Sequence, residues 1–188
     1  MVTINHVNDG WLAATKPVAM KTLLIVYHSN TGATAQMAKA ATAGAQNAIV
    51  ENGSTEVQVR LLQASAAGPT DLLAADAYIF ATPENLAAIS GLMKDFFDRS
   101  YYGALDQING RRYATIICAG SDGSNAARQV ERIATGWRLH AVAAPLIICT
   151  HAQTPEAILA TKQVSASDLA RGETLGATIA AGLAIGAF

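Results

Sequence analysis

The sequence predicts an α/β fold, a single doubly wound sheet of five parallel strands with helices on both faces. Three observations predict it. Five short apolar runs recur along the 188 residues, and stretches with helical periodicity separate them. The apolar runs lack polar alternation, as strands buried on both faces do. Small polar loops follow several of these runs, which is where α/β sheets bind ligands.

The first strand–helix unit opens with residues 22–28, TLLIVYH, an aliphatic run that predicts a buried strand. Residues 31–48 follow as an alanine-rich helix, because the cluster of Ser, Asn and Thr before them supplies N-cap chemistry. Residues 55–62 alternate and predict the second strand. A short helix is expected around Asp71.

The middle of the chain repeats the pattern. Residues 77–82, AYIFAT, predict the third strand. From 89 to 97, apolar residues fall at i, i+3, i+4, i+7 and i+8, which places them on one helix face. Residues 113–119 predict the fourth strand. Residues 126–137 carry another apolar helix face.

The two ends of the chain complete the prediction. Residues 142–149 predict the fifth strand, in which Pro145 indicates an edge position or a bulge. Asp168 is expected to start the last helix, with Ser167 as its cap. Residues 1–20 do not fit the repeating pattern, so we expect a loosely held extension without signal-peptide character before a single domain of residues 21–188.

Composition excludes several function classes. Thirteen basic and fourteen acidic residues give a net charge of −1, without the basic stripe of a nucleic-acid-binding protein. The uncharged C-terminal stretch is shorter than the ~20 residues of a membrane span. Cys118 and Cys149 lie in apolar runs, so we expect buried, reduced thiols and a cytoplasmic location. His28 and His151 lack partners at metal-ligand spacing, and no metal site is predicted.

The loop after the first strand, SNTGAT at residues 29–34, predicts an anion site. A helix N-terminus offers free N–H groups and the positive end of a dipole, and the hydroxyl groups of this loop add donors. The loop lacks the Gly-Lys-Ser/Thr ending of a P-loop and the G-x-G-x-x-G of a dinucleotide fold. A small phosphomonoester is therefore the expected ligand, although the same residues could simply cap a helix.

The motif S-x-T-G-x-T at residues 29–34 resembles the phosphate loop of flavodoxins and flavodoxin-like reductases. The stretch from Thr82 to Arg99, TP-x(6)-SG-x-MK-x-F-x-DR, is similar to the second flavin loop and following helix of tryptophan-repressor-binding-protein-type quinone reductases and NAD(P)H-dependent FMN reductases. The resemblance spans about residues 21–186. It implies the flavodoxin-like strand order 2-1-3-4-5, with FMN at the switch point.

The resemblance also implies a set of cofactor-binding residues and no catalytic side chain. Phosphate contacts fall on Ser29, Asn30, Thr31, Gly32, Ala33 and Thr34. Ribityl and ring contacts fall on the backbone of Pro83, Glu84, Asn85, Leu86, Ala87 and Ala88. A third wall falls on Gly120, Ser121, Asp122 and Gly123. Glu84 follows a proline and is expected to point to solvent.

The function implied is an FMN-dependent oxidoreductase that passes electrons from NAD(P)H to a quinone, a flavin or a similar small acceptor. Two alternatives stay open, a flavodoxin-type electron carrier and a flavodoxin-fold binding or regulatory protein without turnover. Flavodoxins are strongly acidic, and this chain is not. A homo-oligomer, with a dimer favoured, is expected from the uncharged C-terminal helix and the Phe96–Phe97 and Tyr101–Tyr102 pairs.

Overall fold

A computed structural model describes residues 20–188 of the chain, and the predicted extension 1–20 lies outside them except for Met20. The strands are β1 (Lys21–Tyr27), β2 (Val57–Gln63), β3 (Ala77–Asn85), β4 (Ala88–Ile89), β5 (Arg112–Ala119), β6 (His140–Ala141) and β7 (Leu146–Cys149). The helices are α1 (Ala33–Glu51), α2 (Pro69–Leu73), α3 (Gly91–Ala104), α4 (Ser124–Gly136), α5 (Pro155–Leu159) and α6 (Ala166–Ala184).

The sheet has the order β2-β1-β3-β5, with β6 and β7 both beside β5. All of these pairs are parallel. The predicted order 2-1-3-4-5 is therefore confirmed, with β5 as the fourth strand and β6 with β7 as the fifth. The short β4 pairs antiparallel with the end of β3 and forms a hairpin outside the main sheet.

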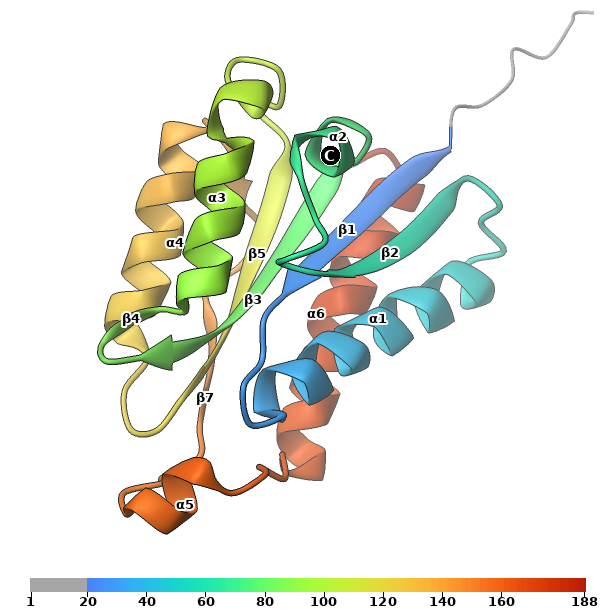
Figure 1. Ribbon diagram of the computed structural model, residues 1–188. Coiled ribbons are helices and arrows are strands. Elements are labelled where there is room, and N and C mark those ends of the chain that lie inside the picture. The colour runs from blue at the N-terminus through green and yellow to red at the C-terminus, as the bar shows by residue number, and fades with distance from the viewer. Residues whose placement is uncertain (1–19) are drawn as a thin grey trace, which may run out of the picture.

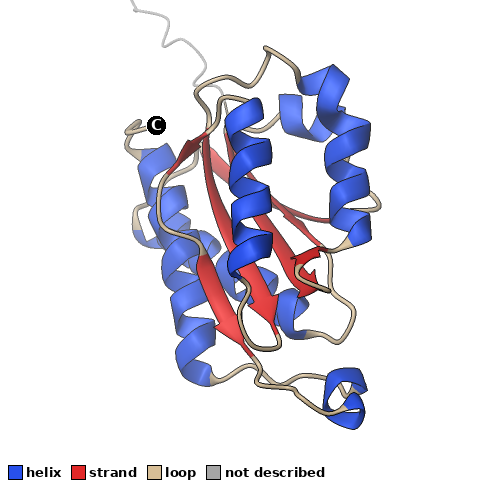
Figure 2. Ribbon diagram, turned by 90° about the vertical axis from the view of Figure 1, so that its left-hand side faces the viewer, coloured by secondary structure: helices blue, strands red, loops and turns tan. Residues whose placement is uncertain are grey.

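Helices cover both faces of the sheet, α3 and α4 on one side and α1 and α6 on the other (Figure 1). The strands alternate between the two layers, as a pleated backbone requires. In β1, Leu24 and Val26 pack toward α3 and α4, whereas Leu23 and Ile25 pack toward α1 and α6. Figure 2 shows the sheet edge-on between these layers. Burial on both faces explains why the strand sequences show no polar alternation.

The structure corrects two expected boundaries and the cap of the last helix. The expected strand 142–149 is interrupted, because Pro145 has no N–H with which to pair. Pro145 therefore lies at the sheet edge, as predicted. The last helix begins at Ala166 rather than Asp168, and its cap is Ser165, whose hydroxyl accepts from the Asp168 N–H at 3.1 Å. Helix α5 and the β3–β4 hairpin were not predicted, because each is too short to show a period.

Candidate functional site

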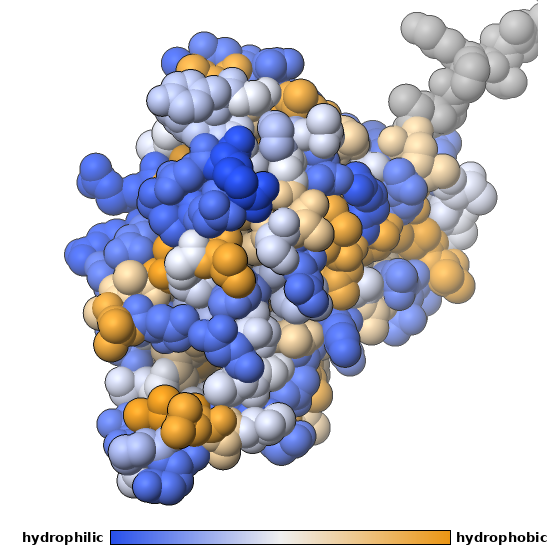
Figure 3. Space-filling model, viewed as in Figure 1, coloured by the Kyte–Doolittle hydropathy of each residue, from blue (hydrophilic) through white to orange (hydrophobic). Residues whose placement is uncertain are grey.

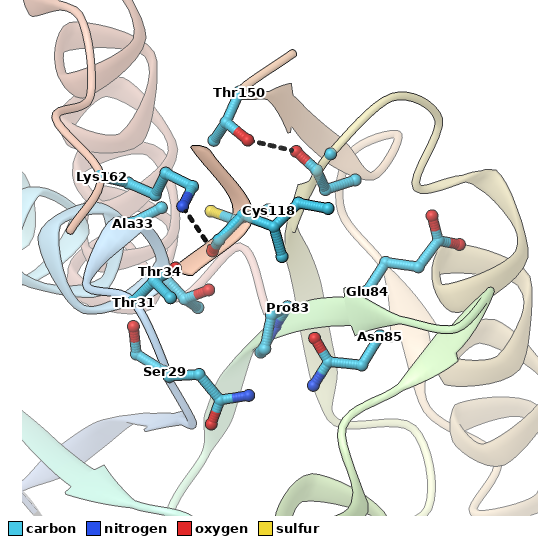
Figure 4. Close-up of a pocket in the computed structure, with 14 residues that line it drawn as sticks. Ser29, Thr31, Ala33, Thr34, Pro83, Glu84, Asn85, Cys118, Thr150 and Lys162 are labelled. Atoms are coloured by element: carbon cyan, nitrogen blue, oxygen red, sulfur yellow. Dashed lines mark hydrogen bonds between the residues drawn. The ribbon is translucent and has the colours of Figure 1, made fainter. Parts of the chain in front are cut away.

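The loops after β1, β3 and β5 meet at one end of the sheet, as the sequence predicted. They enclose a cavity of about 100 Å³. The loop after β1 contributes Ser29, Asn30, Thr31, Ala33 and Thr34, and the end of β3 contributes Pro83, Glu84 and Asn85 (Figure 4). Parallel strands bring their carboxyl ends to one edge, so three loops far apart in sequence share this site.

The first turn of α1 has no side-chain acceptor. Among the six helices of residues 20–188, four carry a side-chain oxygen that accepts from an N–H of the first turn. These oxygens belong to Ser90 for α3, Glu84 for α4, Thr154 for α5 and Ser165 for α6. At α1 the N-cap is Gly32, at φ 93°, whose own N–H donates to Ser29 Oγ at 3.2 Å. The N–H groups of Ala33 and Thr34, which both line the cavity, have no side-chain acceptor among the described residues, as an anion site requires.

A buried hydroxyl supplies a second sign of a missing ligand. Thr34 is 1% exposed, and its Oγ1 has no hydrogen-bond partner among the described residues. A buried polar atom without a partner is rare and calls for an explanation. Thr34 lines the cavity, so an oxygen-rich anion bound there would satisfy both this hydroxyl and the α1 N–H groups. These residues fit a phosphate group.

The cavity floor beside Thr34 is the thiol of Cys118, at the end of β5. Burial raises the pKa of this thiol to about 11; the Thr34 hydroxyl lies close enough to oppose the rise in part, although the two groups do not meet in hydrogen-bond geometry. Cys118 is therefore a neutral group at pH 7 and contributes no charge to the site. Both cysteines are free thiols, as predicted, although Cys149 is only half-buried.

The second loop forms a tight hairpin whose tip residues, Leu86 and Ala87, have φ of 51° and 57°. Two consecutive residues with positive φ make the turn geometry that Asn and Gly normally occupy, so this tip is strained. Leu86 is fully exposed. The Asn125 amide donates to the Ala87 carbonyl, which ties the tip to α4.

The structure corrects the expectation that Glu84 points to solvent. Its carboxylate accepts from the Gly123 N–H at 2.7 Å and from the Ala126 N–H at 3.2 Å, and so caps α4. Figure 4 shows this carboxylate turned away from Thr31 and Thr34. The negative charge is stabilised by the positive end of the α4 dipole. Glu84 thereby fixes the second loop to the third.

One segment at the site comes from far along the chain. Ile158 and Lys162, which lie between β7 and α6, also line the cavity, with Lys162 beside the first loop. The Lys162 N–H donates to the Thr31 carbonyl at 2.8 Å. The Gln36 amide donates to the Lys162 carbonyl at 2.7 Å and accepts from the Val164 N–H at 3.2 Å. Tertiary contacts therefore place a lysine beside a loop whose own sequence has none.

The structure does not bring every predicted residue into this cavity. Nine of them line it: Ser29, Asn30, Thr31, Ala33, Thr34, Pro83, Glu84, Asn85 and Gly120. The others lie around it at the hairpin tip, in the third loop and at Gly32. Sequence reasoning missed five lining residues: Cys118, Ala119, Thr150, Ile158 and Lys162. Ligands bind at the carboxyl ends of parallel strands, and this rule could have found Cys118, Ala119 and Thr150, because these residues end β5 or follow β7. No local sequence pattern indicates that Ile158 or Lys162 lies at the site.

A second cavity of about 280 Å³ lies on the other side of the first loop. It shares Ser29 and Asn30 with the first cavity and is also lined by His28, Gln63 and Leu92. Burial lowers the pKa of His28, so its imidazole is neutral at pH 7. Together the two cavities flank the loop and leave room for a ligand larger than a phosphate group.

Residues 20–188 contain neither a metal-binding cluster nor a membrane-spanning helix. No group of three or more His, Cys, Asp or Glu side chains is arranged to hold a metal ion. None of the helices in this part of the chain is both long and apolar enough to cross a membrane.

Solved structures share this fold at low sequence identity. An archaeal flavodoxin is 17% identical with a TM-score of 0.66, covering 85% of this chain and 96% of its own. A flavodoxin, WrbA-like protein from Agrobacterium tumefaciens is 20% identical with a TM-score of 0.64, covering 88% and 98%. An oxidoreductase from Corynebacterium diphtheriae is 21% identical with a TM-score of 0.61, covering 85% and 96%. These likenesses confirm the flavodoxin-like fold.

No curated protein matches the chain. The family model described as NADPH-dependent FMN reductase matches residues 20–154, which include the loops after β1, β3 and β5. That match covers most of the chain and includes the start of α1, whose first-turn N–H groups have no side-chain acceptor. The chain belongs to the NADPH-dependent FMN reductase family.

Proposed function

We propose that the protein binds FMN and uses it to pass electrons from NADPH or NADH to a quinone, a free flavin or a similar small acceptor. The observation that carries the FMN site is the first turn of α1, whose N–H groups have no side-chain acceptor, beside the unpartnered Thr34 hydroxyl. Ser29 to Thr34 would hold the phosphate, and the backbone of Pro83 to Ala88, with Gly120 to Gly123, would hold the ribityl chain and the ring. When bound, FMN supplies the redox chemistry.

The chain's own residues position and shield the cofactor in this proposal. Glu84 and Asn125 fix the β3–β4 hairpin to α4, so the second and third loops form one rigid wall. Family membership supports NADPH as the donor. Positioning supplies the rate, because transfer between two stacked cofactors needs alignment rather than a side-chain acid or base. The two free cysteines fit a reducing, cytoplasmic compartment.

The near-neutral surface favours the reductase over an electron carrier. Thirteen basic residues against fourteen acidic ones give no field to steer the chain toward a basic protein partner. The intact phosphate loop disfavours a binding protein that has lost its cofactor.

The test is reconstitution of the purified protein with FMN, followed by anaerobic addition of NADPH or NADH. We expect one FMN per chain, tighter binding of FMN than of FAD, and loss of the visible flavin absorbance with a nicotinamide alone. Added quinone should restore the absorbance. Failure to bind FMN would overturn the proposal. A bound flavin that needs a partner protein for reduction would favour the carrier instead.

A further inference from the structure

Lys162 brings a positive charge to the phosphate loop from a distant part of the chain. It belongs to a segment, residues 157–164, that we call the strap. Two of its residues, Ile158 and Lys162, line the cavity, and the backbone of Lys162 is tied to the first loop and to α1 by the bonds to Thr31 and Gln36 described above. Its lysine lines the same cavity as Ser29 and Thr34.

The charge of Lys162 has no counter-charge in the described structure. Within residues 20–188, its ammonium group forms no ion pair with a carboxylate. It donates to three carbonyl oxygens at the end of α5, those of Ala157, Ile158 and Ala160, at 2.6, 2.8 and 2.6 Å. These bonds use all three N–H donors of the ammonium group, but carbonyl groups are neutral dipoles, so its positive charge stays without a neutralising carboxylate at the cavity that Lys162 lines.

Packing holds only one end of the strap, where Val164 lies partly buried against the core. Helix α5 buries no residue, and Ile158 and Leu159 are 52% and 79% exposed. Apolar residues gather on the surface at this end of the molecule (Figure 3). At Lys162 the strap is held by its hydrogen bonds to Thr31 and Gln36, and these bonds place a basic residue at a site whose first loop has hydroxyl and amide donors only.

We propose that Lys162 is the counter-charge that makes this site prefer FMN to riboflavin, the same flavin without its phosphate. The inference rests on the proposed FMN site. A phosphomonoester carries between one and two negative charges at pH 7, so a cation beside it adds attraction that riboflavin cannot use. Lys162 sets cofactor specificity and takes no part in electron transfer.

The experiment compares the dissociation constants of FMN and riboflavin for apoprotein of the wild type, Lys162→Met and Lys162→Arg. We expect Lys162→Met to weaken FMN about 3- to 10-fold, as loss of a charge–charge attraction at a partly exposed site does, with riboflavin changed by less than about twofold. Lys162→Arg should keep most of the preference. Raised salt should weaken FMN less in Lys162→Met than in wild type, because the variant has one fewer charge to screen.

Lys39→Met is the matched control, because Lys39 is exposed on α1 and lines neither cavity. Lys39→Met changes the net charge by the same amount as Lys162→Met, and it should leave the dissociation constants of FMN and riboflavin unchanged. Unchanged riboflavin binding shows that Lys162→Met still folds around the flavin. If Lys162→Met keeps the wild-type preference, or loses both flavins equally, the assignment of Lys162 is wrong while the FMN site stands. A wild type that binds neither flavin overturns the proposed function and this inference together.

Discussion

At the scale of single residues, the unpartnered hydroxyl of Thr34 decides between a ligand site and an ordinary helix start. In Thr34→Val, the FMN dissociation constant should rise about 10- to 100-fold, because one hydrogen bond to a charged group is lost. The apoprotein should unfold at the same urea concentration or higher, since the hydroxyl has no partner to lose. Flavin titration and urea unfolding measure the two effects.

Thr42→Val is the control on the same helix, because Thr42 Oγ1 bonds the Ala38 carbonyl and lies away from the cavity. It should leave FMN affinity unchanged. Unaltered affinity in Thr34→Val would contradict the phosphate assignment.

The Cys118 thiol makes a second prediction at this scale. Burial raises the pKa of the thiol from 9.0 to about 11. As the pH rises above 9, the thiol therefore loses its proton in the unfolded chain before it does so in the folded protein. Its contribution to stability is complete below pH 9 and is lost by pH 11, at about 1.4 kcal/mol for each pH unit. The free energy of unfolding of Cys118→Ala should therefore fall less steeply than that of wild type over this range. Urea unfolding at several pH values measures it, and Cys149→Ala should follow wild type.

At the scale of elements, Glu84 joins the β3–β4 hairpin to α4. Glu84→Gln keeps an oxygen that can accept one N–H but loses the charge at the helix start, so the protein should be destabilised by about 0.3–1 kcal/mol. Turnover with NADPH should change little, because Glu84 points away from the first loop. Glu131→Gln, on the exposed side of α4, should change neither quantity. A collapse of turnover with FMN still bound would give Glu84 a chemical role.

The contact between α1 and α6 depends on glycines. A Cβ atom at Gly176 would lie 1.8 Å from the Ala41 carbonyl oxygen, so Gly176→Ala must push the two helices apart. We expect a loss of at least about 1–3 kcal/mol in unfolding free energy and weaker FMN binding, because α1 carries the phosphate loop. Gly136→Ala meets no atom within 4 Å and should stabilise by about 0.5–1 kcal/mol. If Gly176→Ala and Gly136→Ala changed the unfolding free energy in urea equally, the close approach of α1 and α6 would be contradicted.

At the scale of the whole molecule, the structure removes part of the reason for predicting a dimer. Phe96 and Phe97 are 0% and 3% exposed and belong to the core, whereas Tyr101 and Tyr102 are 42% and 83% exposed. We still expect a dimer, now through the Tyr pair. Tyr102→Glu should shift it to monomer in sedimentation velocity at micromolar concentration, because a charge opposes burial of that surface. A wild type that sediments only as monomer would contradict the prediction.

The sequence by itself determined the layered fold and the polar loop at the start of the first helix. Both rest on short-range signals, namely apolar runs that alternate with helical periods, and a polar loop between a strand and a helix. Because ligands bind at the carboxyl ends of parallel strands, the sequence also predicted that three polar loops lie together at one edge of the sheet, and the structure confirms that they meet. The rule worked because parallel strands end together whatever their order in the chain.

Only the tertiary structure decided the charge and the fixed walls of the site. A proline before Glu84 indicated an exposed side chain, yet the start of α4, about forty residues later, lies close enough to bind its carboxylate. Lys162 follows Thr31 by more than a hundred residues and reaches it only because the strap folds back from the end of the fifth strand onto the first loop. Such pairings depend on long-range packing, which local sequence patterns do not encode.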